Sequence, residues 1–167
     1  MENLSSAELA ARIRTLFETL PDIVFFKDPQ GAFLFANQAF EHLYGYTLEQ
    51  IRGKSDFSFL SHEEAEYFAL RDADAIAAGK PTVSEGWQVN ELTSEQECYE
   101  TIKTPVYAED GTLLGLLGIG RNLTPLRLSQ DASPAANPDE ALRLEGRMAE
   151  LTALIVRFQE ALGDSPR

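Results

Sequence analysis

The sequence predicts an α+β fold, with one five-stranded antiparallel sheet and short helices gathered on one of its faces. Apolar runs joined by turn residues occur first as two short strands and later as three long strands, with several short helical segments between them. The 167 residues leave room for one domain of ordinary size and some additional helix, but not for two full domains.

An amphipathic helix is expected over residues 1–20. Ser5 followed by Glu8 forms a capping box, and Pro21 ends the helix because proline cannot continue it. The apolar residues follow a 4-3-4 spacing that places them on one face: Leu9, Ile13, Leu16 and Leu20.

A β-hairpin is expected next, with strands over residues 23–27 and 32–36. The tetrapeptide Asp28-Pro29-Gln30-Gly31 between them is a strong turn signal. Asn37 then caps a short helix over residues 38–44, and Ser61 caps a longer helix over residues 62–78.

Three long strands are predicted over residues 82–91, 97–107 and 112–122, and they complete a domain that spans residues 21–124. Glycines recur within the last strand pattern rather than before a helix. They therefore indicate close packing of a helix against the sheet, not a phosphate-binding loop: Gly115, Gly118 and Gly120.

The remaining residues differ in character. Residues 125–138 are small, polar and proline-containing, which is typical of a linker. Residues 139–163 then follow a heptad pattern that predicts a helix for self-association or for a partner helix. Its apolar seam consists of Leu144, Met148, Leu151, Ile155, Phe158 and Leu162.

The charge excludes some partners. With 27 acidic and 14 basic residues, the chain carries a formal charge of −13 and is expected to bind neither nucleic acid nor membrane surfaces. The start of the chain has no signal-peptide pattern, so a cytoplasmic location is expected. A single cysteine, Cys98, allows no intramolecular disulfide and no cysteine-based metal cluster.

Two groups of motifs resemble the PAS domain family over residues 18–124. The first group contains Leu20-Pro21-Asp22-Ile23-Val24-Phe25, Asp28-x-x-Gly31, Phe35-Ala36-Asn37-Gln38-Ala39-Phe40 and Gly45-Tyr46-Thr47. The second contains Lys103-Thr104-Pro105-Val106, Glu109-Asp110-Gly111 and Leu116-Leu117-Gly118-Ile119-Gly120-Arg121-Asn122-Leu123-Thr124.

The resemblance implies a PAS fold and a sensory and dimerisation module of a signalling protein. Such modules are often joined to histidine kinases or cyclic-dinucleotide enzymes, which implies a two-component pathway and a kinase or cyclase effector as partner. One departure concerns the exit from the domain, where the family usually has an aspartate and this chain has Asn122, closely followed by Pro125.

Haem and flavin photochemistry are not expected. In PAS members that bind haem, the ligand is a histidine within the long helix, where this chain has Phe68 at the nearest equivalent position. The available histidines are His42, expected to be an ordinary partly buried side chain, and His62, in the first turn of the helix. Light-sensing members need a cysteine within the irregular segment 53–60, and none is present there.

Catalysis is not expected either. The tripeptide Ser61-His62-Glu63 resembles the phosphoacceptor segment of histidine kinases, but the residues that should follow it are absent. Acidic pairs such as Asp72 and Asp74 lie two positions apart on a helix and do not face each other, so a solvated helix face explains them. The chain is therefore interpreted as non-enzymatic.

Two interpretations of the core remain open. Either a cavity binds a small ligand of unknown identity, or the core is filled and the domain serves only in protein interaction and dimerisation. Homodimerisation is expected through the terminal helices. The candidate ligand-binding residues are His42, Tyr44, Tyr46, Phe57, Phe68, Trp87 and Thr101.

Overall fold

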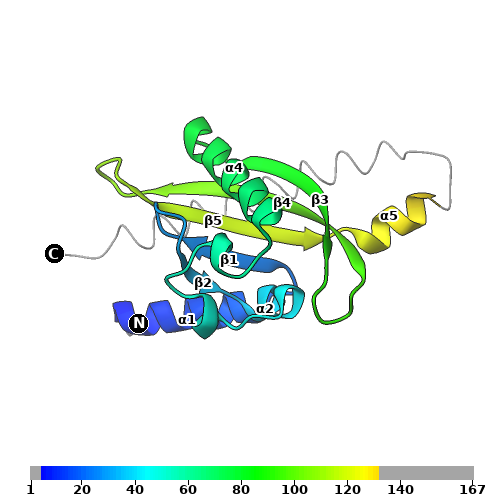
Figure 1. The fold of residues 1–167 in the computed structure, drawn as a ribbon. Helices are drawn as coiled ribbons and strands as arrows, with labels where there is room; N and C mark the ends of the chain where they lie inside the picture. Colours follow the sequence, from blue (N-terminus) through cyan, green and yellow to red (C-terminus); the bar gives the residue numbers. More distant parts are fainter. Residues whose placement is uncertain (1–4, 132–167) are drawn as a thin grey trace. The chain divides into compact units, whose positions relative to one another are not determined.

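The computed structural model of the protein describes residues 5–131. Its centre is one antiparallel sheet of five strands in the order β2-β1-β5-β4-β3 (Figure 1). The strand bounds are β1 (Ile23–Lys27), β2 (Phe33–Ala36), β3 (Thr82–Val89), β4 (Gln96–Tyr107) and β5 (Leu113–Asn122). The first and last strands of the domain therefore pair at the middle of the sheet, and the fold class is as predicted.

Helical segments connect the two strand groups. Their bounds are α2 (Gln38–Tyr44), α3 (Leu48–Ile51), a 3₁₀ turn η1 (Asp56–Ser58) and α4 (His62–Ala78), preceded by α1 (Ser6–Glu18). The longest of them, α4, packs against β3, β4 and η1, while α2 packs against β1. Figure 1 shows α4 crossing the sheet over β3 and β4, which places its side chains above the strands that carry most of the polar residues of the site.

Local capping signals start the helices where the sequence predicts. Ser5 and Ser61 each form a reciprocal capping box with the glutamate three residues later. Asn37 caps α2 and is fully buried. Its side-chain amide donates to the carbonyl oxygens of Phe17 and Asp22, both at 2.9 Å, so its polar atoms are satisfied without water. This one side chain therefore joins the end of α1, the start of β1 and the start of α2.

The glycines of β5 make room for a side chain of the neighbouring strand rather than for a helix. A Cβ atom at Gly118 would lie 2.0 Å from the ring of Phe25, so the ring lies directly over the glycine. A Cβ atom at Gly115 would meet the backbone of Lys27 at 2.1 Å. The expectation of close packing is confirmed, but the partner is β1 and not a helix.

The expected linker begins with a helix, α5 (Thr124–Asp131). Pro125 stands in its first turn, where a missing N–H costs nothing because that group has no partner within the helix. The rest of the expected linker and the heptad-patterned segment 139–163 lie outside the described residues. Within residues 5–131, no helix is long and apolar enough to cross a membrane.

Candidate functional site

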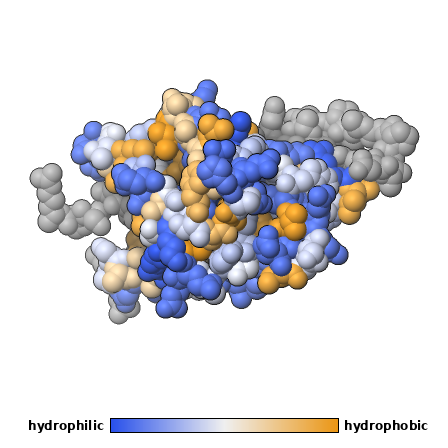
Figure 2. All heavy atoms as spheres, viewed as in Figure 1, coloured by the Kyte–Doolittle hydropathy of each residue, from blue (hydrophilic) through white to orange (hydrophobic). Residues whose placement is uncertain are grey.

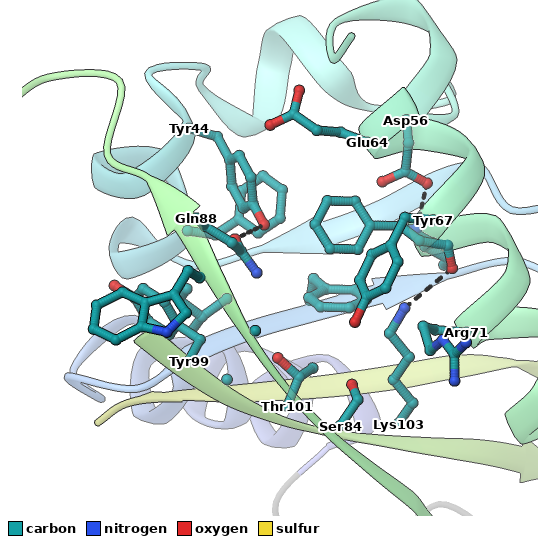
Figure 3. Close-up of a pocket in the computed structure, with 18 of the residues that line it drawn as sticks. Tyr44, Asp56, Glu64, Tyr67, Arg71, Ser84, Gln88, Tyr99, Thr101 and Lys103 are labelled. Atoms are coloured by element: carbon teal, nitrogen blue, oxygen red, sulfur yellow. Dashed lines mark hydrogen bonds and ion pairs between the residues drawn. The ribbon is translucent and has the colours of Figure 1, made fainter. Parts of the chain in front are cut away.

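A cavity of about 410 Å³ lies between the helical segments and the sheet (Figure 3). This volume is near the small end of the range, roughly 300–1,000 Å³, in which proteins hold organic ligands. The cavity is lined by side chains from the helical segments α2, η1 and α4 and by residues from all five strands. The cavity therefore depends on segments from both halves of the domain.

Aromatic rings form one wall of the cavity. Phe33 of β2 lies 5.3 Å from Phe40 of α2, measured between ring centroids, and Phe40 lies 4.5 Å from Tyr44. Phe68 of α4 completes the wall, because its ring meets Tyr44 edge-on at 6.4 Å. Tilted and edge-on contacts of this kind are the arrangements that aromatic rings prefer.

Hydroxyl and amide groups form the opposite wall. Ser84 of β3 and Thr101 of β4 are paired across the two strands, and both line the cavity (Figure 3). The Tyr44 hydroxyl donates to Oε1 of Gln88 at 2.5 Å. Because burial raises the pKa of Tyr44, its hydroxyl keeps its proton and this bond fixes the orientation of the Gln88 amide.

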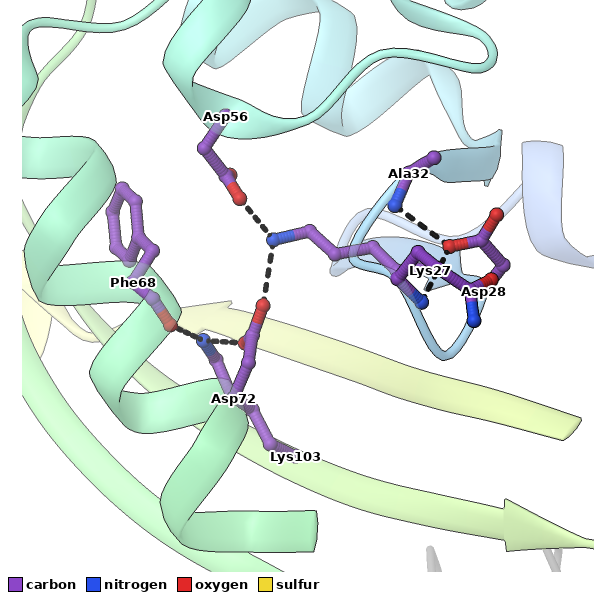
Figure 4. Close-up of polar contacts among 8 residues, drawn as sticks. Lys27, Asp28, Ala32, Asp56, Phe68, Asp72 and Lys103 are labelled. Atoms are coloured by element: carbon purple, nitrogen blue, oxygen red, sulfur yellow. Dashed lines mark hydrogen bonds and ion pairs between the residues drawn. The ribbon is translucent and has the colours of Figure 1, made fainter. Parts of the chain in front are cut away.

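Four charged side chains from different segments meet at one end of the cavity, and we call them the lysine–aspartate cluster: Lys27, Asp56, Asp72 and Lys103 (Figure 4). The Lys27 ammonium lies 2.5 Å from Asp56 Oδ2 and 2.8 Å from Asp72 Oδ2. The Lys103 ammonium donates to Asp72 Oδ1 and to the carbonyl oxygen of Phe68, the latter at 3.2 Å. The cluster joins β1, η1, α4 and β4 around the cavity.

The lysine–aspartate cluster is buried, with Lys27 1%, Lys103 3%, Asp56 7% and Asp72 9% exposed. Two positive and two negative charges balance, which is what makes their removal from water tolerable. Burial lowers the pKa of Lys103, and the neighbouring Asp72 acts in the opposite direction.

Hydrogen bonds link the other end of the cavity to the end of the domain, and we call these residues the exit cluster: Tyr99, Glu97, Asn122 and Thr124. The Tyr99 hydroxyl and the Asn122 amide both donate to Glu97 Oε2, each at 2.7 Å. The backbone N–H of Thr124 donates in turn to Asn122 Oδ1 at 2.8 Å. Tyr99 lines the cavity, so a continuous path runs from the cavity wall to the residue at which α5 begins.

Four of the seven candidate ligand-binding residues line the cavity: Tyr44, Phe68, Trp87 and Thr101. Trp87 does so only at the edge, because it alternates along β3 with Ser84, Gly86 and Gln88 and its side chain is 52% exposed. That any of the four contacts a ligand stays a prediction.

The other three candidates lie elsewhere: His42, Tyr46 and Phe57. His42 is exposed on α2, contrary to the partly buried position expected for it. Tyr46 packs against Phe59, with 5.3 Å between ring centroids, and the half-exposed Phe57 contacts His62.

The interpretation of Asp72 as part of a solvated helix face is wrong. Asp72 is buried between two lysines, while Asp74 is exposed and pairs with Arg71 at 3.3 Å. The two aspartates point in different directions from α4, as their spacing requires. Sequence analysis also missed Lys27 and Lys103 as site residues.

A sequence signal for the two lysines does exist. Lys27 continues the alternation of Ile23 and Phe25, and Lys103 continues that of Tyr99 and Thr101, so each lysine falls on a strand face whose other members are buried or half-buried. A lysine in such a position needs a buried acidic partner.

The described residues hold no visible centre for metal chemistry. Within residues 5–131, no three His, Cys, Asp or Glu side chains are grouped in a way that could hold a metal ion. His62 is largely exposed and pairs with Glu66 at 3.2 Å.

Figure 2 shows apolar side chains interspersed with hydrophilic ones over the face that is viewed, rather than one continuous apolar patch.

The sheet and its helices enclose a small cavity lined by polar and aromatic side chains. The chain is therefore an α+β domain with an internal cavity. The profile of a family described as "PAS fold" matches residues 17–128. The chain therefore belongs to the PAS family, a family of sensory domains.

Relatives of known function include a histidine kinase and a sensor protein. The chain is 27% identical over 116 residues to the methanogenesis regulatory histidine kinase FilI of Methanothrix harundinacea, which covers 70% of this chain and 13% of FilI. It is 27% identical over 128 residues to the aerobic respiration control sensor protein ArcB of Escherichia coli, covering 77% of this chain and 16% of ArcB. The chain thus spans about a sixth or less of these relatives.

A solved structure with a similar fold is VqmA bound to DPO, with a TM-score of 0.60 and 26% identity over 68% of this chain and 57% of that chain. A VqmA dimer from Vibrio cholerae has a TM-score of 0.62 and 25% identity over 74% of this chain and 53% of that chain.

Proposed function

We propose that this chain is the sensory domain of a signalling protein, that it binds a small molecule in its cavity, and that it passes the signal on through its flanking helices as a homodimer. The observation that carries the proposal is the cavity of about 410 Å³, whose aromatic and polar walls face each other. A core that served only packing would leave no such space, because protein interiors are close-packed.

Ligand binding by a protein that contains this fold has a precedent. VqmA, which is 26% identical over 68% of this chain, is described as bound to DPO. The precedent supports the proposal that this chain also binds a small molecule.

The exit cluster supports transmission of the signal. A ligand that contacts Tyr99 can shift or break the bond from its hydroxyl to Glu97, which also holds Asn122. Asn122 accepts the N–H of Thr124, so the start of α5 senses the change. Signalling then requires only that ligand-bound and free domains prefer different arrangements of this cluster.

An exposed apolar face supports dimerisation. No residue of α1 is buried, and Leu16 is 63% exposed. Leu9 and Ile13 are half-buried, and Leu20 lies exposed just beyond the helix. Burying this face against a second copy would remove apolar surface from water.

The proposed output rests on the relatives of the chain. FilI is a histidine kinase, and a further matching relative is a diguanylate cyclase of Vibrio cholerae. This chain matches only a part of each, so a kinase effector, or a cyclase effector in its place, is proposed as partner. Contact with nucleic acid is not proposed, because the chain carries a formal charge of −13.

Native mass spectrometry of the purified 167-residue chain, compared with its denatured mass, tests the proposal. We expect a dimer that carries one extra mass per chain. A dimer without extra mass would leave only a protein-interaction domain, and a bare monomer would contradict both binding and dimerisation.

A further inference from the structure

Two opposite walls of the cavity determine the shape and polarity of a ligand that could bind there. Phe33, Phe40 and Phe68 present ring surfaces on one side, while Ser84 and Thr101 present hydroxyl groups on the other. A flat ring body packs well against aromatic rings, and a polar edge is needed where the hydroxyl groups lie.

Two buried or half-buried side chains that line the cavity keep N–H donors that are not used within residues 5–131. Lys103 has three N–H groups, of which two are taken by Asp72 and the carbonyl of Phe68. Gln88 accepts from Tyr44 through Oε1, so its NH₂ group is free to donate, with no acceptor in the part of the chain that the structure describes. Both residues line the cavity (Figure 3).

The buried charges at the cavity balance one another, because Lys27 and Lys103 are paired with Asp56 and Asp72. The other charged side chains that line the cavity are exposed to solvent: Glu63, Glu64 and Arg71. A charged ligand would therefore add an uncompensated charge to a partly dry site, which is unfavourable for either sign.

We infer that the cavity takes a small, uncharged ring compound that carries a hydrogen-bond acceptor at its edge and receives N–H groups from Gln88 and Lys103. This inference rests on the proposed function, because it names the class of ligand for the same cavity. Ser84 and Thr101 can donate or accept, so they complete the contacts to the rest of the polar edge.

Four probes built on a bicyclic aromatic ring test the class. Quinoline and naphthalene have nearly the same shape, while 2-naphthoate and 1-naphthylmethylammonium each add a charged substituent. Each is titrated into the 167-residue chain by calorimetry at neutral pH. Quinoline differs from naphthalene by one acceptor nitrogen, so it should bind at least about tenfold more tightly, as expected for one good hydrogen bond to a buried donor. Both charged probes should bind more weakly than quinoline.

A substitution at Gln88 tests its N–H donor alone, because it leaves the ion pairs of the lysine–aspartate cluster intact. Gln88→Glu keeps the oxygen that accepts from Tyr44 but removes the N–H groups. Quinoline should lose about tenfold in affinity, whereas naphthalene should change by less than about twofold. Gln30→Glu, at an exposed turn residue, is the control for the added charge and should leave both affinities unchanged.

The outcomes separate this inference from the proposed function. Equal affinities for quinoline and naphthalene, tighter binding of a charged probe, or a charged co-purified ligand would overturn the class of ligand while leaving the cavity a binding site. Failure of all four probes, together with a bare chain in native mass spectrometry, would overturn the class and the proposed function together.

Discussion

The two ends of the cavity differ in what their polar contacts connect, although both start from the same face of β4. At one end, Lys103 belongs to a cluster whose ion pairs join residues 29 to 45 positions apart in sequence. At the other end, Tyr99 bonds to Glu97 two residues away, and the contacts continue across the sheet to Asn122.

This difference in contacts suggests different roles for the two ends: the lysine–aspartate cluster stabilises the fold, and the exit cluster transmits the signal. The lysine–aspartate cluster is buried and holds strands and helices together, so breaking it should lower the unfolding free energy of the domain strongly. The exit cluster includes the exposed Asn122 and leads to the end of the domain, so it can rearrange at low cost. Substitutions at the two ends should therefore have effects of very different size.

The largest effect is expected for Asp72→Ala. It removes the carboxylate shared by Lys27 and Lys103 and leaves Lys103 without an acidic partner. Loss of one partner from a buried ion pair typically costs about 3–5 kcal/mol of unfolding free energy. Urea denaturation measures it, and Asp74→Ala, on the exposed face of the same helix, should cost at most about 0.5 kcal/mol. Similar losses in the two variants would show that the cluster does not hold the fold.

A smaller loss is expected at the exit cluster from Asn122→Asp. The new carboxylate would face Glu97 and could not donate to it, so about 1 kcal/mol should be lost. Adding Glu97→Gln should restore part of that loss, because the new amide can donate to the new aspartate, although it no longer offers the oxygen that accepts from the Tyr99 hydroxyl. A double-mutant cycle with no coupling between the two positions would mean that they do not interact in solution.

A modest gain is expected from Thr104→Val. The Thr104 hydroxyl is buried without a hydrogen-bond partner among the described residues, unlike the neighbouring Lys103. Replacing it with a methyl group of the same shape should raise the unfolding free energy by about 1 kcal/mol. Thr101→Val, where the hydroxyl faces the cavity, should bring no such gain.

The smallest expected effect is the dependence of stability on alkaline pH, and its sign should differ between the two ends. Burial lowers the pKa of Lys103 below 10.5, so the unfolded chain binds more protons and stability should rise as pH increases toward 10.5. Burial raises the pKa of Tyr99 above 10.0, so stability should fall as pH increases beyond 10.0.

Unfolding free energies measured from pH 8 to pH 11 check both signs. Lys103→Met should flatten the rise, and Tyr99→Phe should weaken the fall. If Lys103→Met steepened the rise instead, the ammonium would not be disfavoured by burial.

Much of the fold could be predicted from the sequence because its signals are local. The capping boxes at Ser5 and Ser61 act over three residues, and each helix begins where they predict. The turn at Asp28 is held by the backbone N–H groups of Gln30 and Ala32, which both donate to Asp28 Oδ1 at 2.9 Å. Such interactions form within a few residues and need no other part of the chain.

The candidate site could be predicted only in part. Tyr44, Phe68 and Thr101 were found because aromatic and hydroxyl residues on the expected core elements are natural cavity residues. Trp87 was predicted to bind the ligand but lies at the edge of the cavity. The sequence alone does not say which of the two faces of an edge strand is covered by the rest of the domain.

The sequence by itself determined which segments become helices and strands and where they begin. Only the tertiary structure decided which charges are buried, because Asp72 and Asp74 are equivalent in sequence and differ only in what α4 packs against. The partners Lys27, Asp56 and Lys103 come from three other segments, and their attraction acts at a few ångströms once packing has excluded water. That meeting of distant residues produces the polar end of the cavity.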